Sequence, residues 1–387
     1  MKKALLLLAF GALILGACQK DPQKETPSKD SELTGEKVDV SGIPTNIKKV
    51  FVLNEGGMGS NNATLDFLRV SDGNYITGTF KKMNPDAAAG LGDVGNDIVI
   101  IGDEAWIVVN NSGIVEVLSA KDETEIAAIQ IATPRNIAFD SDYAYVSSWA
   151  GAYTTYTYNP DAGYSTITDY KNPKGQVYRI NLKTKKVEGS VEVGYQPEGL
   201  AVSNGKLYVA NSGGISSQLP PNYAYDNTVS VIDTKTFKAE KTITAVVNLK
   251  NVYADKSGKI YVTTLGNYYD VHSGLYSIDG DTATKVTDYV SVSAIKDDTI
   301  FVIGTDSEFD WQAAHEYKAY SVKNGTKTEI TLPVSGTPYG FAAISSTTFL
   351  VADAGDYFNP GTVSCYSNGA KVWTVTAGVC PGHFAIY

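Results

Sequence analysis

Aromatic side chains with a polar tip are the residues of this 387-residue chain whose number and spacing point to a function. The chain has 25 tyrosines against 12 phenylalanines, and tyrosine combines an apolar ring with a hydroxyl that suits a hydrated contact surface. Five segments with the composition of long loops contain fifteen aromatic residues, a share well above the 11 % of the whole chain. These segments are 148–175, 211–227, 265–273, 304–317 and 353–361.

A single ring in such a loop could pack onto the strands beneath it, but short loops cannot bury fifteen large rings. Exposed aromatic surface bordered by polar groups usually marks a binding site, and Asn, Ser and Gly between the rings supply hydrogen bonds to an amphipathic ligand. We therefore predict a binding surface built from these loops and from neighbouring connections. The candidate residues are Arg135, Trp149, Tyr153, Tyr195, Glu198, Tyr223, Tyr225, Tyr268, Tyr269, His272, Phe309, Trp311, His315, Tyr339, Tyr357 and Phe358.

The chain has three histidines, His272, His315 and His383, and all three are expected at this same surface. They could serve a metal ion or acid–base chemistry, but no His-x-x-His or His-Glu-x-x-His spacing places two ligands on one element. No Gly-x-Ser-x-Gly elbow, phosphate-binding loop or dinucleotide fingerprint occurs either. The sequence therefore favours solvent-facing histidines and predicts a binding protein without a resident metal or cofactor, rather than an enzyme.

The elements that must position these residues repeat along the chain. Residues 195–247 contain four short, β-branched segments, at 199–203, 207–210, 228–232 and 239–245, and the first two flank an Asn-Gly hairpin turn. Such a small antiparallel sheet needs similar neighbours to bury its faces, and a repeat of about 40 to 50 residues is typical of a β-propeller blade.

Seven such repeats can be counted, and they predict an all-β, seven-bladed β-propeller. The segment 382–387 is expected to complete the blade whose other strands lie within 46–84, which removes the free sheet edge. Antiparallel alternation then places every long loop on one side of the ring and every short turn on the other. The first strands of the repeats are expected to begin near Asp97, Asn136, Gly199, Asn251, Ala294, Gly340 and His383.

The N-terminus has the pattern of a targeting signal. Two lysines precede an apolar run that is too short for a stable membrane span, and the following Leu15-Gly16-Ala17-Cys18 resembles a bacterial lipobox. We expect residues 1–17 to be a lipoprotein signal peptide, with an ordinary signal peptide as the alternative, and Cys18 to be acylated. Residues 18–45, rich in charged residues, Ser and Pro, are expected to form a flexible tether, and 46–387 the propeller.

Charge and cysteine content limit the possible partners. The formal net charge is −10 and no basic cluster follows the first residues, which argues against nucleic acid as a partner. Cys365 and Cys380 could form a disulfide in an oxidising compartment, and their spacing leaves this open.

The segment Pro197-x-Gly-Leu-Ala, followed by Leu-Tyr-Val-Ala-Asn-Ser and Thr-Val-Ser-Val-Ile-Asp-Thr234, resembles YncE-like and surface-layer-type propellers. Together with the lipobox, the tether and the aromatic loops, the chain resembles the cobalamin-capturing (BtuG-type) surface lipoproteins of gut Bacteroidetes. That resemblance implies a lipid-anchored outer-membrane protein, displayed at the cell surface, that binds vitamin B12 (cobamides) as cargo and passes it to a TonB-dependent transporter. The alternatives are a surface glycan-binding lipoprotein and a protein similar to streptogramin-lyase-type propellers, whose metal one of the histidines and a carboxylate would hold.

Overall fold

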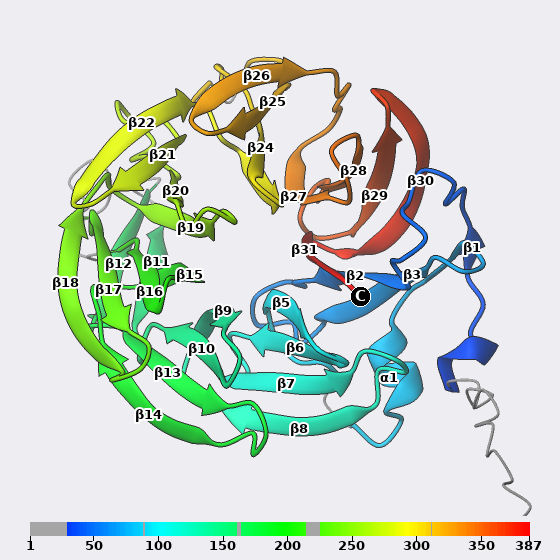
Figure 1. Ribbon diagram of the computed structural model, residues 1–387, viewed down its shortest axis with the longest axis horizontal. Coiled ribbons are helices and arrows are strands. Elements are labelled where there is room, and N and C mark those ends of the chain that lie inside the picture. Colours follow the sequence, from blue (N-terminus) through cyan, green and yellow to red (C-terminus); the bar gives the residue numbers. More distant parts are fainter. Residues whose placement is uncertain (1–28, 88–89, 161–163, 214–224, 311) are drawn as a thin grey trace, which may run out of the picture.

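The computed structural model describes residues 29–87, 90–160, 164–213, 225–310 and 312–387. Apart from the short helix α1 (Thr79–Met83) and the 3-10 helix η1 (Lys29–Glu32), the regular structure in these residues is β-strand. Seven antiparallel sheets follow one another around a common axis, and Figure 1 views the ring along that axis. The predicted seven-bladed β-propeller is confirmed.

Six blades are four-stranded, with the first strand at the axis and the last on the outer wall. The second and third blades comprise β5 (Gly95–Ile101), β6 (Glu104–Val109), β7 (Ile114–Ser119) and β8 (Glu125–Gln130), then β9 (Pro134–Phe139), β10 (Tyr143–Ser148), β13 (Gln176–Asn181) and β14 (Val187–Glu192). The fourth and fifth comprise β15 (Pro197–Ser203), β16 (Lys206–Asn211), β17 (Thr228–Asp233) and β18 (Lys238–Thr244), then β19 (Leu249–Ala254), β20 (Ile260–Thr264), β21 (Gly274–Asp279) and β22 (Thr282–Asp288). The sixth and seventh comprise β23 (Val292–Lys296), β24 (Thr299–Gly304), β25 (Lys318–Lys323) and β26 (Thr326–Ile330), then β27 (Pro338–Ala343), β28 (Thr348–Asp353), β29 (Pro360–Ser367) and β30 (Ala370–Val379).

The first blade closes the ring by combining the two ends of the chain. Its order is β1 (Glu36–Lys37), β4 (Asn74–Ile76), β3 (Thr64–Arg69), β2 (Lys49–Asn54) and β31 (Pro381–Ile386). The C-terminal strand β31 pairs antiparallel with β2, with Leu53 opposite His383. Closure by the C-terminal strand is therefore confirmed.

The hydrophobic core lies between neighbouring blades, because each sheet buries both faces. All six residues of β2 are buried, and one cluster joins Phe51 and Leu53 of the first blade to Ile107 of the second. The Phe51 and Phe67 rings meet edge to face at 6.1 Å. Outer strands such as β18 are mostly exposed, as expected for the wall of the ring.

The innermost strands begin two residues earlier than the alternating pattern predicts. β5 begins at Gly95 rather than Asp97 and β15 at Pro197 rather than Gly199. The register shifts within these first residues, and a bulge breaks the period-two pattern on which the prediction depends.

Residues 29–45 differ from the expected flexible tether, since they pack on the first and seventh blades. Ile43 is buried in the cluster that contains Val50 and Cys365, and β1 pairs with β4. Lys49 Nζ lies 2.7 Å from both Asp30 Oδ2 and Glu123 Oε1. The polar composition of this segment provides little apolar surface to offset the entropy lost on ordering. These few contacts with the blades supply the missing stabilisation. Cys18 and the expected signal peptide lie outside the described residues.

The structure adds one hairpin that was not predicted and decides whether two cysteines are bonded. The segment 148–175, expected to be a loop, contains a separate hairpin of β11 (Tyr153–Asn159) and β12 (Tyr164–Lys171). Cys365 and Cys380 are both buried and both free, so no disulfide joins them.

Among the described residues, no helix combines the length and apolar character that a membrane span requires.

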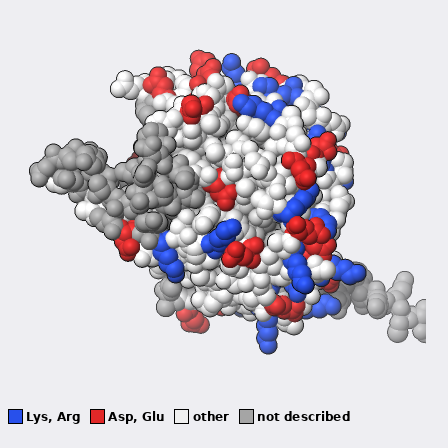
Figure 2. All heavy atoms as spheres, turned by 90° about the vertical axis from the view of Figure 1, so that its left-hand side faces the viewer, with Lys and Arg blue, Asp and Glu red and all other residues white. Residues whose placement is uncertain are grey.

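The outer wall carries both signs of charge. Figure 2 shows the wall on the side of β18 and β22, where Lys and Arg side chains are mixed with Asp and Glu. Lys206 forms ion pairs with Asp233 and Glu240 there, and Lys241 pairs with Asp281. The described residues of this face form no basic patch of the kind that nucleic acids require.

The buried Lys49 predicts a large effect of one charge on stability. In Lys49→Met, Asp30 and Glu123 lose their common buried cation, and we expect a loss of about 3–5 kcal/mol in the free energy of unfolding. The exposed neighbour provides the control, since Lys48→Met is expected to change it by less than about 0.5 kcal/mol. Thermal unfolding measures both, and equal melting temperatures would contradict the packing of residues 29–45 through Lys49.

Glu116 on β7 predicts a pH-dependent stability. Burial, with a smaller contribution from the charge of Glu125, raises the pKa of Glu116 from 4.5 to about 7. The unfolded chain therefore loses this proton near pH 4.5 and the folded protein only near pH 7. The contribution of protonated Glu116 to the free energy of unfolding is fully present below pH 4.5 and is lost as the pH rises through 7.

Glu116→Gln keeps the side chain neutral at every pH. We expect it to raise the free energy of unfolding at pH 8 by up to about 3 kcal/mol and to have little effect at pH 4. Denaturant titrations at the two pH values test this, with the exposed Glu192→Gln as the control. A gain of the same size at pH 4 would contradict ionisation of Glu116 as the cause.

Candidate functional site

The long loops lie on one side of the ring, here called the loop side, where the first strand of each blade also begins. The second residue of these strands is Arg135 in β9, Glu198 in β15, Lys250 in β19 and Tyr339 in β27. The register shifts at or next to each of these positions, and a bulge re-aims a side chain. We call the axial end formed by these four residues, with Glu55 and His383, the mouth.

A charged pair joins the third and fourth blades at the mouth. Arg135 Nε donates to the Glu198 carboxylate, with separations of 3.2 and 3.1 Å to its two oxygens. The Arg135 guanidinium also lies 4.4 Å from the centre of the Trp149 ring. One face of Trp149 is therefore covered, and its buried Nε1 has no acceptor among the described residues.

A second polar cluster stands on the first and seventh blades. His383 Nε2 lies 2.9 Å from Glu55 Oε1, and the Tyr339 hydroxyl donates to Glu55 Oε2 at 2.6 Å. Burial acts to raise the pKa of Glu55, but the hydrogen bonds from His383 and Tyr339 and the charges of His383 and Lys250 outweigh it, so this pKa lies below its ordinary value. Burial and the Glu55 charge raise the pKa of Tyr339 far above its ordinary value.

The loops of the fifth and sixth blades form a histidine–carboxylate cluster. His272 Nδ1 lies 2.8 Å from Glu308 Oε1. The Phe309 ring stacks on the imidazole at 4.9 Å, and Tyr289 meets it edge to face at 4.9 Å. Burial, and the nearby Glu308 charge, raise the pKa of Tyr268 despite a hydrogen bond with the Asn248 side chain.

Exposed aromatic side chains lie on the loops that carry or adjoin these polar clusters. Phe358 is 85 % exposed and Tyr269 52 % exposed, and Tyr153, Tyr268 and Tyr357 are each nearly half exposed. The other large apolar side chains with high exposure, apart from Met58, lie on the outer strands β8, β14 and β30 or at the end of β9. The loop side thus combines exposed rings with a polar mouth, as the loop composition predicts.

The remaining predicted residues have local partners. Tyr153 donates its hydroxyl to Asp169 across the β11–β12 hairpin. Tyr195 is half-buried, 5.7 Å from the Lys174 ammonium. The exposed His315 has its Nδ1 2.9 Å from the Ser307 hydroxyl. Tyr225 is half-buried.

Two predicted residues, Tyr223 and Trp311, lie outside the described residues. The structure otherwise gathers Arg135, Glu198 and Trp149 in one cluster, His272 and Phe309 in another, and Tyr339 and Tyr357 in a third, where the two rings meet edge to face at 5.7 Å.

Sequence reasoning missed Glu55, Lys250, Tyr289 and Glu308. Lys250 could have been found by aligning the inner strands, since it occupies the position of Arg135, Glu198 and Tyr339. Glu55 and Glu308 gave no comparable signal, because each becomes part of the site only through its contact with a histidine on another segment of the chain.

No group of three or more His, Cys, Asp or Glu side chains placed to hold a metal ion occurs within the described ranges.

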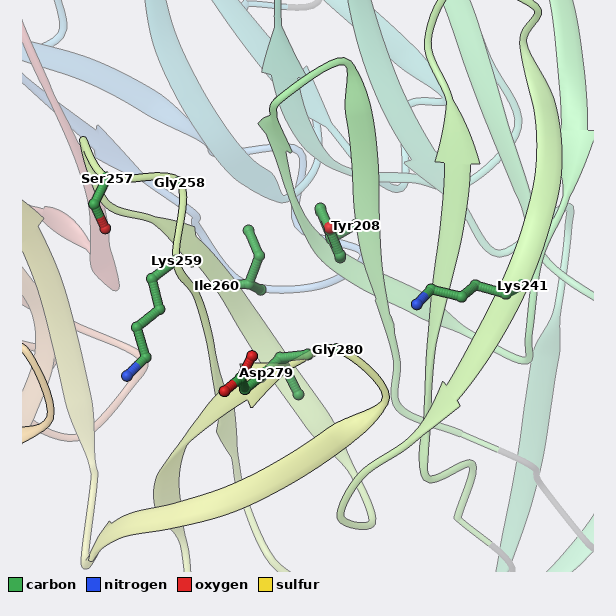
Figure 3. A pocket seen from close by; sticks show the side chains of 9 residues that line it. Tyr208, Lys241, Ser257, Gly258, Lys259, Ile260, Asp279 and Gly280 are labelled. Carbon is green, nitrogen blue, oxygen red and sulfur yellow. The ribbon is translucent and has the colours of Figure 1, made fainter.

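Two cavities lie away from the mouth. One, of about 430 Å³, lies between the fourth and fifth blades beside the turns at Ser257–Gly258 and Asp279–Gly280, and Figure 3 shows Lys241 and Tyr208 beside it. The other, of about 510 Å³, lies where the N-terminal segment passes between the first and seventh blades and is lined by Glu36, Asp66 and Thr376 among others.

Comparisons with known proteins support the fold alone. No protein-family description and no curated protein matches the chain. Among solved structures, Kuenenia stuttgartiensis hydrazine synthase is similar, with a TM-score of 0.56 and 14 % identity over 75 % of this chain and 88 % of that chain. The Neurospora crassa Pan2 WD40 domain gives a TM-score of 0.48 and 11 % identity over 74 % and 79 % of the two chains. The chain has the fold of a seven-bladed β-propeller.

The Glu55 cluster predicts a stability effect with the opposite pH dependence from that of Glu116. Because the pKa of Glu55 is lowered on folding, its stabilising contribution is present above pH 4.5 and is lost as the pH falls through the folded pKa. We expect Glu55→Gln to lower the free energy of unfolding at pH 7 by about 1–3 kcal/mol, and the difference from the wild type to shrink as the pH falls through the folded pKa of Glu55. Chemical denaturation at a series of pH values from 7 downward measures this, with the exposed Glu188→Gln as the control, and a loss that did not change with pH would contradict it.

Proposed function

We propose that this protein binds a vitamin B12-type corrinoid on the loop side of the propeller and delivers it to a transporter without acting as an enzyme. The observation that carries the proposal is the set of exposed rings around the polar mouth, namely Tyr153, Tyr268, Tyr269, Tyr357 and Phe358. Exposed aromatic and apolar surface with a polar border is typical of a ligand-binding face.

The chemistry of a corrinoid suits such a surface. A corrin is a broad, flat, largely apolar ring system with amide groups around its edge. The exposed rings can cover the apolar face, since Tyr and Phe give a large contact area and have few rotatable bonds to immobilise. Arg135, Glu198, Glu55 and Tyr339 provide donors and acceptors for amides. Their ion pairs and hydrogen bonds are formed before a ligand arrives, which limits the entropic cost of binding.

The N-terminal sequence supplies the location in this proposal. Cleavage at the lipobox would leave Cys18 as a lipidated N-terminus, and two or more acyl chains give stable membrane attachment. Residues 19–28 are the part of the proposed tether that precedes η1 (Lys29–Glu32). We propose that the lipid holds the propeller at the outer membrane surface, where a TonB-dependent transporter receives the corrinoid.

Titration of the purified propeller with cyanocobalamin tests the ligand. We expect the corrinoid to co-elute with the protein in gel filtration and to raise the melting temperature, since a ligand that binds only the folded state stabilises it. The same thermal measurement with a panel of oligosaccharides tests the glycan alternative. Stabilisation by a glycan and not by the corrinoid would overturn the proposal.

Two exposed rings should contribute measurably to affinity. Both rings are exposed in the absence of a ligand and would be buried against the corrinoid. We therefore expect Phe358→Ser and Tyr269→Ser each to weaken corrinoid binding by about 1–2 kcal/mol, roughly tenfold in Kd. Val372→Ser, an equally apolar exposed position on the outer strand β30, should leave the affinity unchanged. Isothermal titration measures all three, and equal effects of the loop-side and wall variants would contradict this binding face.

A further inference from the structure

We propose that the His272 imidazole is an axial ligand to the cobalt of the bound corrinoid, with Glu308 as the residue that positions it. The inference rests on the proposed function and adds to it a direct bond between protein and cargo.

The hydrogen bond to Glu308 fixes which imidazole nitrogen is available. His272 Nδ1 lies 2.8 Å from Glu308 Oε1, and a carboxylate can only accept, so Nδ1 carries the proton and Nε2 holds the lone pair of the neutral ring. Nε2 has no hydrogen-bond partner in the part of the chain that the structure describes. A histidine that binds a metal through one nitrogen and donates from the other to a carboxylate is the usual arrangement at metal centres.

The orientation of this ring is fixed before any ligand binds. Phe309 stacks on one face with an interplanar angle of 12°, and the Tyr289 ring lies against it at 62°. Glu308 is itself held, because the Ser273 backbone N–H donates to Oε1 at 3.0 Å and the Ser273 hydroxyl donates to Oε2. A ligand supported by such a second layer of contacts meets the tight geometric demands of metal coordination.

The ring also lies within the exposed aromatic surface. The His272 side chain is 37 % exposed, and its loop carries the exposed Tyr268 and Tyr269. The Asn267 Oδ1 accepts backbone hydrogen bonds from Tyr269 and from the two residues after it, which ties the loop into one conformation. The lone pair and the rings that would contact the flat corrin therefore share one short, ordered loop.

The other two histidines lack this combination. His383 uses Nε2 for Glu55. His315 faces the Ser307 hydroxyl, which can donate or accept, so neither nitrogen is committed to metal binding. Only His272, among the three histidines, has a carboxylate on one nitrogen and stacked aromatic support.

The proposed step is a ligand exchange. In a corrinoid that carries axial water, one cobalt–water bond breaks, the water leaves intact, and a cobalt–nitrogen bond forms with the Nε2 lone pair. Coordination through the Nε2 lone pair of the neutral imidazole releases no proton, and cobalt keeps its oxidation state.

Two corrinoids that differ only at the axial positions test the proposal. Aquacobinamide carries exchangeable water, whereas dicyanocobinamide has both positions filled. We expect aquacobinamide to change its visible spectrum to that of an imidazole complex when it binds the wild-type protein. His272→Ala should abolish that change and weaken aquacobinamide binding by at least about tenfold, with less than about a threefold effect on dicyanocobinamide. Val372→Ser, on the outer strand β30 and away from the loop side, is the control and should retain both the spectrum and the affinity.

The outcomes separate this inference from the function on which it rests. If the wild-type protein binds both corrinoids but leaves the aquacobinamide spectrum unchanged, cobalt ligation is wrong and corrinoid binding stands. Equal loss of affinity for both corrinoids in His272→Ala would also overturn ligation, since it would assign the ring a packing role. If neither corrinoid co-elutes with the wild-type protein, the proposed function fails and ligation fails with it.

Discussion

The pairing of β2 with β31 is the constraint on which the rest of the structure depends. A propeller blade buries both faces against its neighbours, so an open ring would expose two apolar sheet faces and leave two unpaired edges. Placing the last strand of the chain beside β2 removes both problems. The same pairing brings Glu55, which follows β2, next to His383 in β31, so the closure of the fold also builds one side of the mouth.

Ring geometry explains why the candidate residues come from every part of the chain. Six of the seven inner strands have a register shift in their first residues, and each blade adds the connection that follows its second strand. Seven small contributions therefore meet around a common axis, and Arg135 can contact Glu198 from the next blade. Aromatic loops outside this polar mouth leave rings exposed because each loop is too short to fold over its own side chains.

The charged groups divide into those that hold the fold together and those that are available to a ligand. Lys49, Asp30 and Glu123 are buried and fasten the N-terminal segment to the first two blades. The pairs at the mouth are only partly buried, and the His272–Glu308 pair leaves one ring nitrogen without a partner among the described residues. The first group serves stability, and the second has the accessibility that recognition needs.

The sequence by itself determined the number of blades, the position of nearly every strand and the side of the ring that carries the loops, because strand alternation and turn residues are local signals. It also identified most of the exposed rings, since their enrichment in loops is visible in composition. It could not show that residues 29–45 are ordered, because the few contacts of Ile43 and Asp30 are made with distant strands. The β11–β12 hairpin was likewise hidden by the loop-like composition of its segment. Only the tertiary structure decided that Trp149 lies under Arg135, that Cys365 and Cys380 stay apart, and that Glu55 and Glu308 each meet a histidine, since these pairings are set by the packing of separate blades and loops.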